Sequence, residues 1–258
     1  MKTIIKANVV EAITVPFTIS VAATDEGLSY EYLGSVTPLI EADLKRVDAR
    51  FSPFKDDSLV SRFQRGEDSL LALDREFQQV YGAVSVAKDQ TEGLFNPYYG
   101  GKYDPTGYVK GWSIQTAFEK HLAPLLEDSR VVGVCLNGGG DMQFASQHDF
   151  TWNIGIEDPR DLQSYLAAYQ LTNGAVATSG YSKRGHHIQA VKEDDLLQVT
   201  VVDDQLSFAD VWATAGMAAG QAEFNALIAK YRLSGLYLTQ TGQLVVFNRG
   251  AINNVNAA

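Results

Sequence analysis

The chain has 258 residues, of which 45% are hydrophobic and 20% are charged. This composition is close to ordinary globular usage and excludes disordered, collagen-like and coiled-coil chains. Thirty-one acidic and 21 basic residues give a net charge of -10. That balance excludes non-specific nucleic-acid binding, which requires a positive face, but it still allows a small phosphate ligand held by local N–H groups, a lysine or a metal.

The amino-terminal segment does not have the pattern of a targeting signal. Lys6 and Glu11 interrupt any apolar stretch there, so we expect no signal peptide. No window approaches the ~20 apolar residues of a transmembrane helix. We therefore expect a soluble cytoplasmic protein without membrane insertion. Its one cysteine, Cys135, cannot form an internal disulfide and lies in an apolar run typical of core packing.

The first half of the chain indicates strands followed by helices. Residues 4–33 carry strand-type side chains, including the segment LSYEYLG. Residues 35–48 have the apolar spacing of a helix, and Asp74 is placed to cap another one. A loop rich in glycine and tyrosine covers 93–108, and Lys110 then opens a further helix.

The second half is rich in strands. Apolar and β-branched runs predict them at 131–137, 150–159, 174–180, 186–190 and 196–202. Helices are predicted at 208–219 and 221–231, followed by a hairpin over 235–248 that turns at Thr241 and Gly242. Helices early, strands in the middle and a terminal hairpin predict an α+β fold with mixed or antiparallel sheets and flanking helices.

Four segments carry residues suited to chemistry. The first is YDPTGYVKGW, residues 103–112, where Gly107 and Gly111 flank Lys110. A helix start offers free N–H groups to a phosphate, and Lys110 would add a positive charge. The alternative is a tight turn with a solvated lysine.

The second segment is the glycine run from Asn137 to Asp141, which follows an apolar strand. Successive glycines allow the backbone to approach a ligand closely, and the acid can accept from a ribose hydroxyl or a ring N–H. The alternative is an ordinary glycine turn with Asp141 as a turn residue.

The third segment runs from Ala177 to Gly180 and is followed by Arg184 to Ile188. Thr178 and Ser179 offer hydroxyl donors at a strand end. His186 and His187 point to opposite faces of an extended chain, so only one of them faces the same site as Ser179. In the alternative interpretation, both histidines simply lie on the protein surface.

The fourth segment is Ser207 to Thr214. Asp210, Ala213 and Thr214 share one helix face, and Asp210 with Thr214 can supply two oxygens to Mg²⁺. The alternative is a capping box in which Ser207 caps the helix and Asp210 is its third residue. Both interpretations can hold at once.

In this order the segments resemble the ApbE family of FAD:protein FMN transferases. The family pattern has a Ser-x-x-Ser-Arg-like segment, an acid before Lys-Gly, a Gly-Gly-Asp turn, Ala-Thr-Ser-Gly followed by His-Ile, and an Ala-Asp-x-x-x-Thr helix. The corresponding residues here are Ser58 to Arg62, Asp104 with Lys110-Gly111, Gly139 or Gly140 with Asp141, Ala177 to Gly180 with His187-Ile188, and Ala209-Asp210 with Thr214. The match runs from about residue 45 to about 220.

The resemblance implies one α+β unit over residues 1–258, two-lobed and T-fold-like, with FAD between the lobes. Mg²⁺ would lie by the FAD pyrophosphate, held by the Asp210 carboxylate, Thr214 and backbone carbonyls near Val109 and Ala213. FAD would contact Asp104, Lys110, Gly139, Gly140, Asp141, Ala177, Thr178, Ser179 and His187.

The implied reaction is attack by a Thr or Ser hydroxyl of an acceptor protein on the FMN-side phosphorus of FAD, with AMP as the leaving group. His187 is the candidate base because an imidazole titrates nearest neutral pH. Asp210 is better used on the metal, although it could share that role. Two alternatives remain: an Mg²⁺-dependent FAD pyrophosphatase that releases FMN and AMP, and a non-catalytic FAD-binding protein.

The sequence departs from the family pattern in three places. Val15-Pro16-Phe17-Thr18 replaces the usual Met-Gly-Thr of the first strand. The stretch before Lys110 is short and has Asn96 where Asp is common. QAVKEDD follows His187-Ile188 in place of Asp-Pro-x-Thr-Gly. The last departure concerns part of the implied FAD pocket wall.

Overall fold

The structure is a computed structural model that describes residues 3–180 and 195–255. Its centre is a nine-stranded sheet in the order β1-β2-β3-β4-β7-β8-β9-β10-β11, in which every neighbouring pair is antiparallel. The strands are β1 (Ile4–Ala12), β2 (Val15–Ala23), β3 (Val131–Gly138), β4 (Asp141–Ser146), β7 (Gly174–Gly180), β8 (Leu196–Asp203), β9 (Ser234–Thr239), β10 (Leu244–Asn248) and β11 (Ala251–Val255). The predicted α+β class is confirmed.

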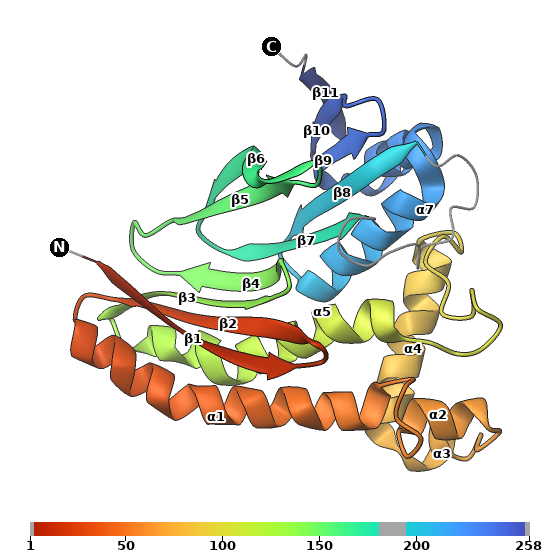
Figure 1. Cartoon of the computed structure of the whole chain (residues 1–258), viewed down its shortest axis with the longest axis horizontal. Coiled ribbons are helices and arrows are strands. Elements are labelled where there is room, and N and C mark those ends of the chain that lie inside the picture. Colours follow the sequence, from red (N-terminus) through yellow and green to blue (C-terminus); the bar gives the residue numbers. More distant parts are fainter. Residues whose placement is uncertain (1–2, 181–194, 256–258) are drawn as a thin grey trace.

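The helices cover one face of this sheet and extend beyond one end of it (Figure 1). They are α1 (Glu26–Phe51), α2 (Leu59–Gln64), α3 (Leu70–Leu73), α4 (Arg75–Gln90), α5 (Thr106–Ala117) and α7 (Leu206–Tyr231). A π-helical turn, η1 (Phe118–Leu122), and a 3-10 turn, η2 (Ala123–Glu127), continue α5. Figure 1 shows α1 running beside β1 and β2, and α2 to α4 gathered at the far end of α1.

A separate hairpin of β5 (Trp152–Asp158) and β6 (Asp161–Leu171) lies on the opposite face. Side chains of β3, β4, β7 and β9, such as Cys135, Phe144, Val176 and Leu236, form a small core with it. The larger core lies between the sheet and the helices. The sheet therefore has a helix face and a hairpin face. Neither β6 nor β11 is predicted by the strand patterns of the sequence.

The segment LSYEYLG is helical, so the strand prediction for residues 28–33 is wrong. Helix α1 begins directly after β2, where the Asp25 side chain accepts from the Leu28 N–H at 3.0 Å. Its buried side chains recur every three or four residues from Ser29 through Leu33 and Val36 to Phe51. This helical period outweighs the local strand preference of the two tyrosines.

Helix α4 confirms the predicted cap. The Asp74 carboxylate accepts from the Phe77 N–H at 2.9 Å, and Phe77, Val80, Val84 and Ala87 are buried. Helix α5 begins at Thr106, so Lys110 lies one turn inside the helix and does not open it. The glycine- and tyrosine-rich loop accordingly ends sooner than predicted.

The predicted pair of helices at 208–219 and 221–231 corresponds to α7, which is interrupted at the predicted point. Gly220 has φ 72° and ψ 173°, a backbone conformation that breaks the helix. The second half starts anew, because the Asp195 carboxylate accepts from the Gln221 N–H at 2.9 Å. The terminal hairpin of β9 and β10 turns at Gly242 as predicted.

Within the described part of the chain, no helix has the length and apolar character required to cross a membrane.

Candidate functional site

One residue of the first predicted segment and one of the glycine run meet on the helix face of the sheet. Lys110 of α5 and Asp141, the first residue of β4, form an ion pair through Nζ and Oδ2, and both side chains are buried. The alternative interpretation of Lys110 as a solvated lysine is therefore wrong, and Asp141 is no ordinary turn residue. A buried pair of this kind is costly to desolvate unless further hydrogen bonds satisfy its atoms.

The second oxygen of Asp141 provides such a bond to the third predicted segment. Asp141 Oδ1 accepts from the Thr178 N–H at 2.9 Å, across the pairing of β4 with β7. Residues Lys110, Asp141 and Thr178 thus form a chain of contacts from α5 through β4 to β7. The Thr178 hydroxyl lies 2.9 Å from that of Thr200 on β8.

Asp210 of α7 packs directly on α5. A Cβ atom added to Gly111 would lie 3.1 Å from Asp210 Oδ2, so the glycine is what allows the carboxylate to approach so closely. The Asp210 side chain is 1% exposed, and its Oδ2 has no hydrogen-bond partner among the described residues. It is the one buried carboxylate oxygen in the described chain with neither a hydrogen bond nor an ion pair.

The neighbouring predicted metal ligands lie on the same helix. Thr214 Oγ1 is 3.3 Å from Ser179 Oγ of β7, so the hydroxyls of the third and fourth segments meet. Ala213 on α7 and Val109 on α5 are buried. The described residues contain no cluster of three or more acidic, histidine or cysteine side chains.

This donor set fits Mg²⁺ better than an ion that needs a complete protein cage. Mg²⁺ takes oxygen ligands and is bound in many enzymes by one or two carboxylates together with waters and substrate phosphates. A single buried carboxylate with an unpartnered oxygen, next to a threonine hydroxyl, has this composition. The fit rests on the orphaned Asp210 oxygen.

Two glutamines that the sequence interpretation missed hold the first turn of α7 in place. Gln143 of β4 accepts from the Leu206 N–H at 3.0 Å, and Gln115 of α5 accepts from the Ser207 N–H at 3.1 Å and from its hydroxyl at 2.9 Å. Gln143 is two residues beyond Asp141 on the same strand face, and Gln115 is four residues beyond Gly111 on the same helix face. Those spacings were the available signals.

The capping-box interpretation of Ser207 is wrong. Gln205 is the N-cap of α7 and makes no side-chain cap bond, so Ser207 lies inside the first turn with its hydroxyl bound to Gln115. Asp210 is then past the positions where a carboxylate caps its own helix. Its burial has no local explanation.

The other predicted site residues lie outside this set of contacts. Asp104 accepts from the N–H and the hydroxyl of Thr106 and so fixes the entry into α5. Gly139 and Gly140 form the turn from β3 to β4, both with positive φ, and the Gly140 N–H donates to the Asn137 side chain at 2.9 Å. Ala177 is buried on β7 beside Thr178. His187 lies outside the described residues, as do Arg184, His186 and the strand predicted at 186–190.

The motif at Ser58 to Arg62 is structural in its described contacts. The Ser58 side chain accepts from the Ser61 N–H at 3.0 Å and caps α2. The Arg62 guanidinium donates to Glu67 at 2.9 Å.

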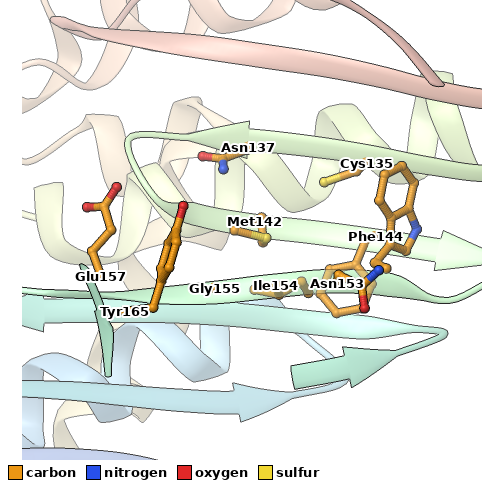
Figure 2. A pocket seen from close by; sticks show the side chains of 10 residues that line it. Cys135, Asn137, Met142, Phe144, Asn153, Ile154, Gly155, Glu157 and Tyr165 are labelled. Atoms are coloured by element: carbon orange, nitrogen blue, oxygen red, sulfur yellow. The ribbon is translucent and has the colours of Figure 1, made fainter. Parts of the chain in front are cut away.

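A pocket of about 280 Å³ lies on the hairpin face (Figure 2), and Asp210 is not among its lining residues. Figure 2 shows Asn137, Glu157 and Tyr165 toward one end of it and Cys135 and Phe144 toward the other. Burial raises the pKa of the Cys135 thiol to about 12, as expected of a core cysteine. The pocket and the cluster around Asp210 are therefore separated by the sheet.

The chain matches the model of the ApbE family over residues 1–104 and 100–237. No curated protein sequence matches it.

Solved structures resemble this one over nearly their whole length. The ApbE protein of Thermotoga maritima superposes with a TM-score of 0.77 at 17% identity, covering 98% of this chain and 97% of its own. The flavin transferase ApbE of Vibrio cholerae gives 0.72 at 16% identity, with coverages of 100% and 98%. The flavinyl transferase ApbE of Pseudomonas stutzeri gives 0.73 at 16%, with 96% of each chain. At these identities the likeness shows a shared fold.

Proposed function

This chain belongs to the ApbE family, and we propose that it transfers FMN from FAD to a Thr or Ser hydroxyl of an acceptor protein, with Mg²⁺ and with release of AMP. The observation that carries the proposal is the buried Asp210 oxygen without a partner. A buried carboxylate left unpaired costs stability, and such an unsatisfied group in a folded protein is explained by a catalytic role or a bound water or ion. Two of the similar structures also bear the name flavin or flavinyl transferase.

Asp210, Thr214 and the carbonyls of Val109 and Ala213 would hold Mg²⁺. When bound, the ion neutralises charge that develops on the pyrophosphate oxygens during phosphoryl transfer. The packing of Asp210 on Gly111 fixes the carboxylate between α5 and α7. The bonds from Gln115 and Gln143 hold the first turn of α7, and so the position of Asp210 along the helix axis.

The hydroxyls at the end of β7 would face the phosphates. Ser179 lies beside Thr214, and Thr178 is tied to Asp141 through its N–H. The ion pair with Lys110 orients the Asp141 carboxylate at this strand end. FAD contacts by Asp104, Gly139, Gly140 and Ala177 remain part of the proposal.

In the proposed reaction the acceptor hydroxyl oxygen forms a bond to the FMN-side phosphorus. The bond from that phosphorus to the bridging oxygen breaks, and AMP leaves with the electron pair. The hydroxyl proton passes to a base, for which His187 is our candidate. Because the chain carries a net charge of -10, we propose that the acceptor is recognised locally and not by long-range attraction.

The proposal treats residues 1–258 as one functional unit. The proposed site includes Asp104, Lys110, Asp141, Thr178 and Asp210, which are spread over more than a hundred positions of the chain. No division of the chain between residues 104 and 210 leaves this set within one part.

The test is to incubate the protein with FAD, Mg²⁺ and a flavin-acceptor domain, and to look for flavin fluorescence on the acceptor band in a denaturing gel. Transfer that requires Mg²⁺ supports the proposal. Free FMN formed without an acceptor would identify a pyrophosphatase instead. FAD bound tightly with no AMP released, over several acceptors, would identify a binding protein. Either of the last two results overturns the transferase assignment.

A further inference from the structure

The strand β1 forms an open edge of the large sheet. It has nine residues, pairs on one side with β2 without a bulge, and contains no proline. Among the described residues, none of β1 makes a backbone hydrogen bond outside the β1–β2 ladder. The opposite edge, β11, has only five residues. A long, regular and unprotected edge is a template for pairing with another strand.

The outward face of β1 carries three successive exposed apolar side chains, followed by the exposed Glu11. Lys6 and Asn8 face α1, since Lys6 pairs with Glu26 at 2.6 Å and Asn8 donates to Thr37 at 3.0 Å. By alternation, Ile5, Ala7 and Val9 lie on the other face. Ile5 is 51% exposed and Val9 is 61% exposed.

The flank of α1 beside this edge has a second unexplained feature. Tyr30 lies under Lys6, whose Nζ is 5.0 Å from the ring centre, and is 55% exposed. Gly34 and Pro38 continue the same row at four-residue steps and are exposed. A Cβ added to Gly34 would meet nothing within 4 Å. Glycine and proline both disfavour a helix interior, and no contact among the described residues requires a glycine at position 34.

We propose that β1 and this flank of α1 form the interface of a homodimer, in which the two β1 strands pair antiparallel about a two-fold axis at Ala7. In that register Ile5 lies opposite the partner's Val9, and Ala7 lies opposite its own copy. On the helix layer, Asn8 contacts Thr37 and Lys6 contacts Glu26 and Tyr30. The α1 residue nearest the axis is therefore close to Gly34.

A second copy of this chain fits this surface because the β1 strand and the flank of α1 can each pair with their own copy about the same axis. The apolar pair of Ile5 and Val9 repeats on each side of Ala7, and Tyr30 and Pro38 are equally spaced about Gly34. Two helices packed across the axis lie 8–10 Å apart, and a residue without a side chain at the closest point permits that approach. Antiparallel cross-strand apolar pairs stabilise such an edge contact.

The decisive measurement is the mass of the full chain in solution, by light scattering or sedimentation over a range of concentrations. We expect a dimer for the natural sequence and a monomer for Gly34→Arg, whose side chain has open space within one copy but would lie at the axis. Gly82→Arg is the matched control, because Gly82 is also an exposed helix glycine with nothing within 4 Å of an added Cβ. It should remain a dimer.

The register is tested by Ala7→Cys under mild oxidation. Residues directly opposite in an antiparallel pair have Cα atoms roughly 4.5–5.5 Å apart, within disulfide reach, so we expect a cross-linked dimer. Val9→Cys should not cross-link, since its copy is four residues away along the strand. The natural sequence should not cross-link either, because Cys135 is buried. A monomeric natural chain, a dimeric Gly34→Arg variant, or equal cross-linking of both cysteine variants would overturn the proposal.

Discussion

The molecule holds two groups of charged side chains that are built in opposite ways. On the helical surface, Asp43 is matched by Lys120 at 2.8 Å and His121 at 2.7 Å, and Arg50 contacts Asp74 at 2.8 Å and Glu76 at 2.7 Å. Each of these acids has at least one cation. Between α5, α7 and the sheet, Asp141 is paired with Lys110, but Asp210 Oδ2 has no hydrogen-bond partner among the described residues.

The paired surface acids and the unpartnered buried carboxylate differ in what they contribute to stability and in what they indicate about function. Partly exposed ion pairs each contribute little, because water and salt screen them. A buried pair is different, since removing one member leaves an uncompensated charge. A buried carboxylate oxygen without a partner reduces stability. It therefore indicates that the carboxylate binds a ligand that is not part of the polypeptide. The following predictions test this contrast, beginning with the largest effect.

Replacing Asp210 by Asn should lower the rate of flavin transfer by about 10²-fold or more, because a metal ligand contributes several kcal/mol to such a reaction. The free energy of unfolding should stay the same or rise, because an unpaired buried charge is removed. Gel fluorescence of the acceptor and urea denaturation measure the two effects. Asp43→Asn is the control, with the same chemical change on the surface. Full activity in Asp210→Asn would break the contrast.

Replacing Lys110 by Met should cost about 3–5 kcal/mol of unfolding free energy, since Asp141 then remains buried and charged. Adding Asp141→Asn should restore part of the loss. Denaturant titration of the single and double variants gives the coupling directly. A single variant that loses less than about 1 kcal/mol would mean that this pair behaves like a surface pair.

Replacing Asp74 by Ala should cost about 1–2 kcal/mol, because the carboxylate both caps α4 and accepts two hydrogen bonds from Arg50. Asp56→Ala, at an exposed loop position, should change stability by less than about 0.5 kcal/mol. Thermal unfolding of both variants measures the difference. Equal losses at the two positions would contradict the role of the cap.

The smallest effect concerns acid. Burial acts to raise the pKa of Asp43, but hydrogen bonds from Lys120 and His121 outweigh it and hold the pKa below its ordinary value. A depressed folded-state pKa contributes stability above the unfolded pKa of about 3.9 and loses it as pH falls further. The melting temperature should therefore fall as the pH is lowered below about 4, and it should fall less steeply in Asp43→Asn. Identical acid profiles would show that this network does not contribute.

The helices with clear caps and regular periods could be predicted from the sequence, while segments decided by packing could not. Asp74 with its following apolar stripe located α4, and the glycine at 220 marked the break of α7. By contrast, LSYEYLG has strand-type side chains, and the Asp25 cap together with the burial of Leu28 and Leu33 accompanies its helical structure. Strand β6 was missed because its outer residues, such as Leu162 and Tyr165, are apolar yet exposed.

The candidate site was predicted as a set of segments but not as a set of contacts. The order of the motifs brought Lys110, Asp141 and Thr178 into one hypothesis, and the structure joins them. Sequence spacing equally allowed Asp210 to cap its own helix. That choice depends on where α7 begins, which is set by Gln143 and Gln115 from other elements. Long-range hydrogen bonds of this kind leave no local pattern.

The position of the β5–β6 hairpin has a consequence for the order of folding. Met142 and Phe144 of β4 pair with Val176 and Gly174 of β7, so residues 145–173 must be looped out before these strands meet. Closing that loop costs conformational entropy before the contacts between β4 and β7 can form and offset the cost. Hairpins such as β1–β2 and β9–β10 close over short turns. We therefore expect the bond from Thr178 to Asp141 to form late, so that a newly made chain acquires helices and hairpins before it acquires the proposed phosphate-binding site.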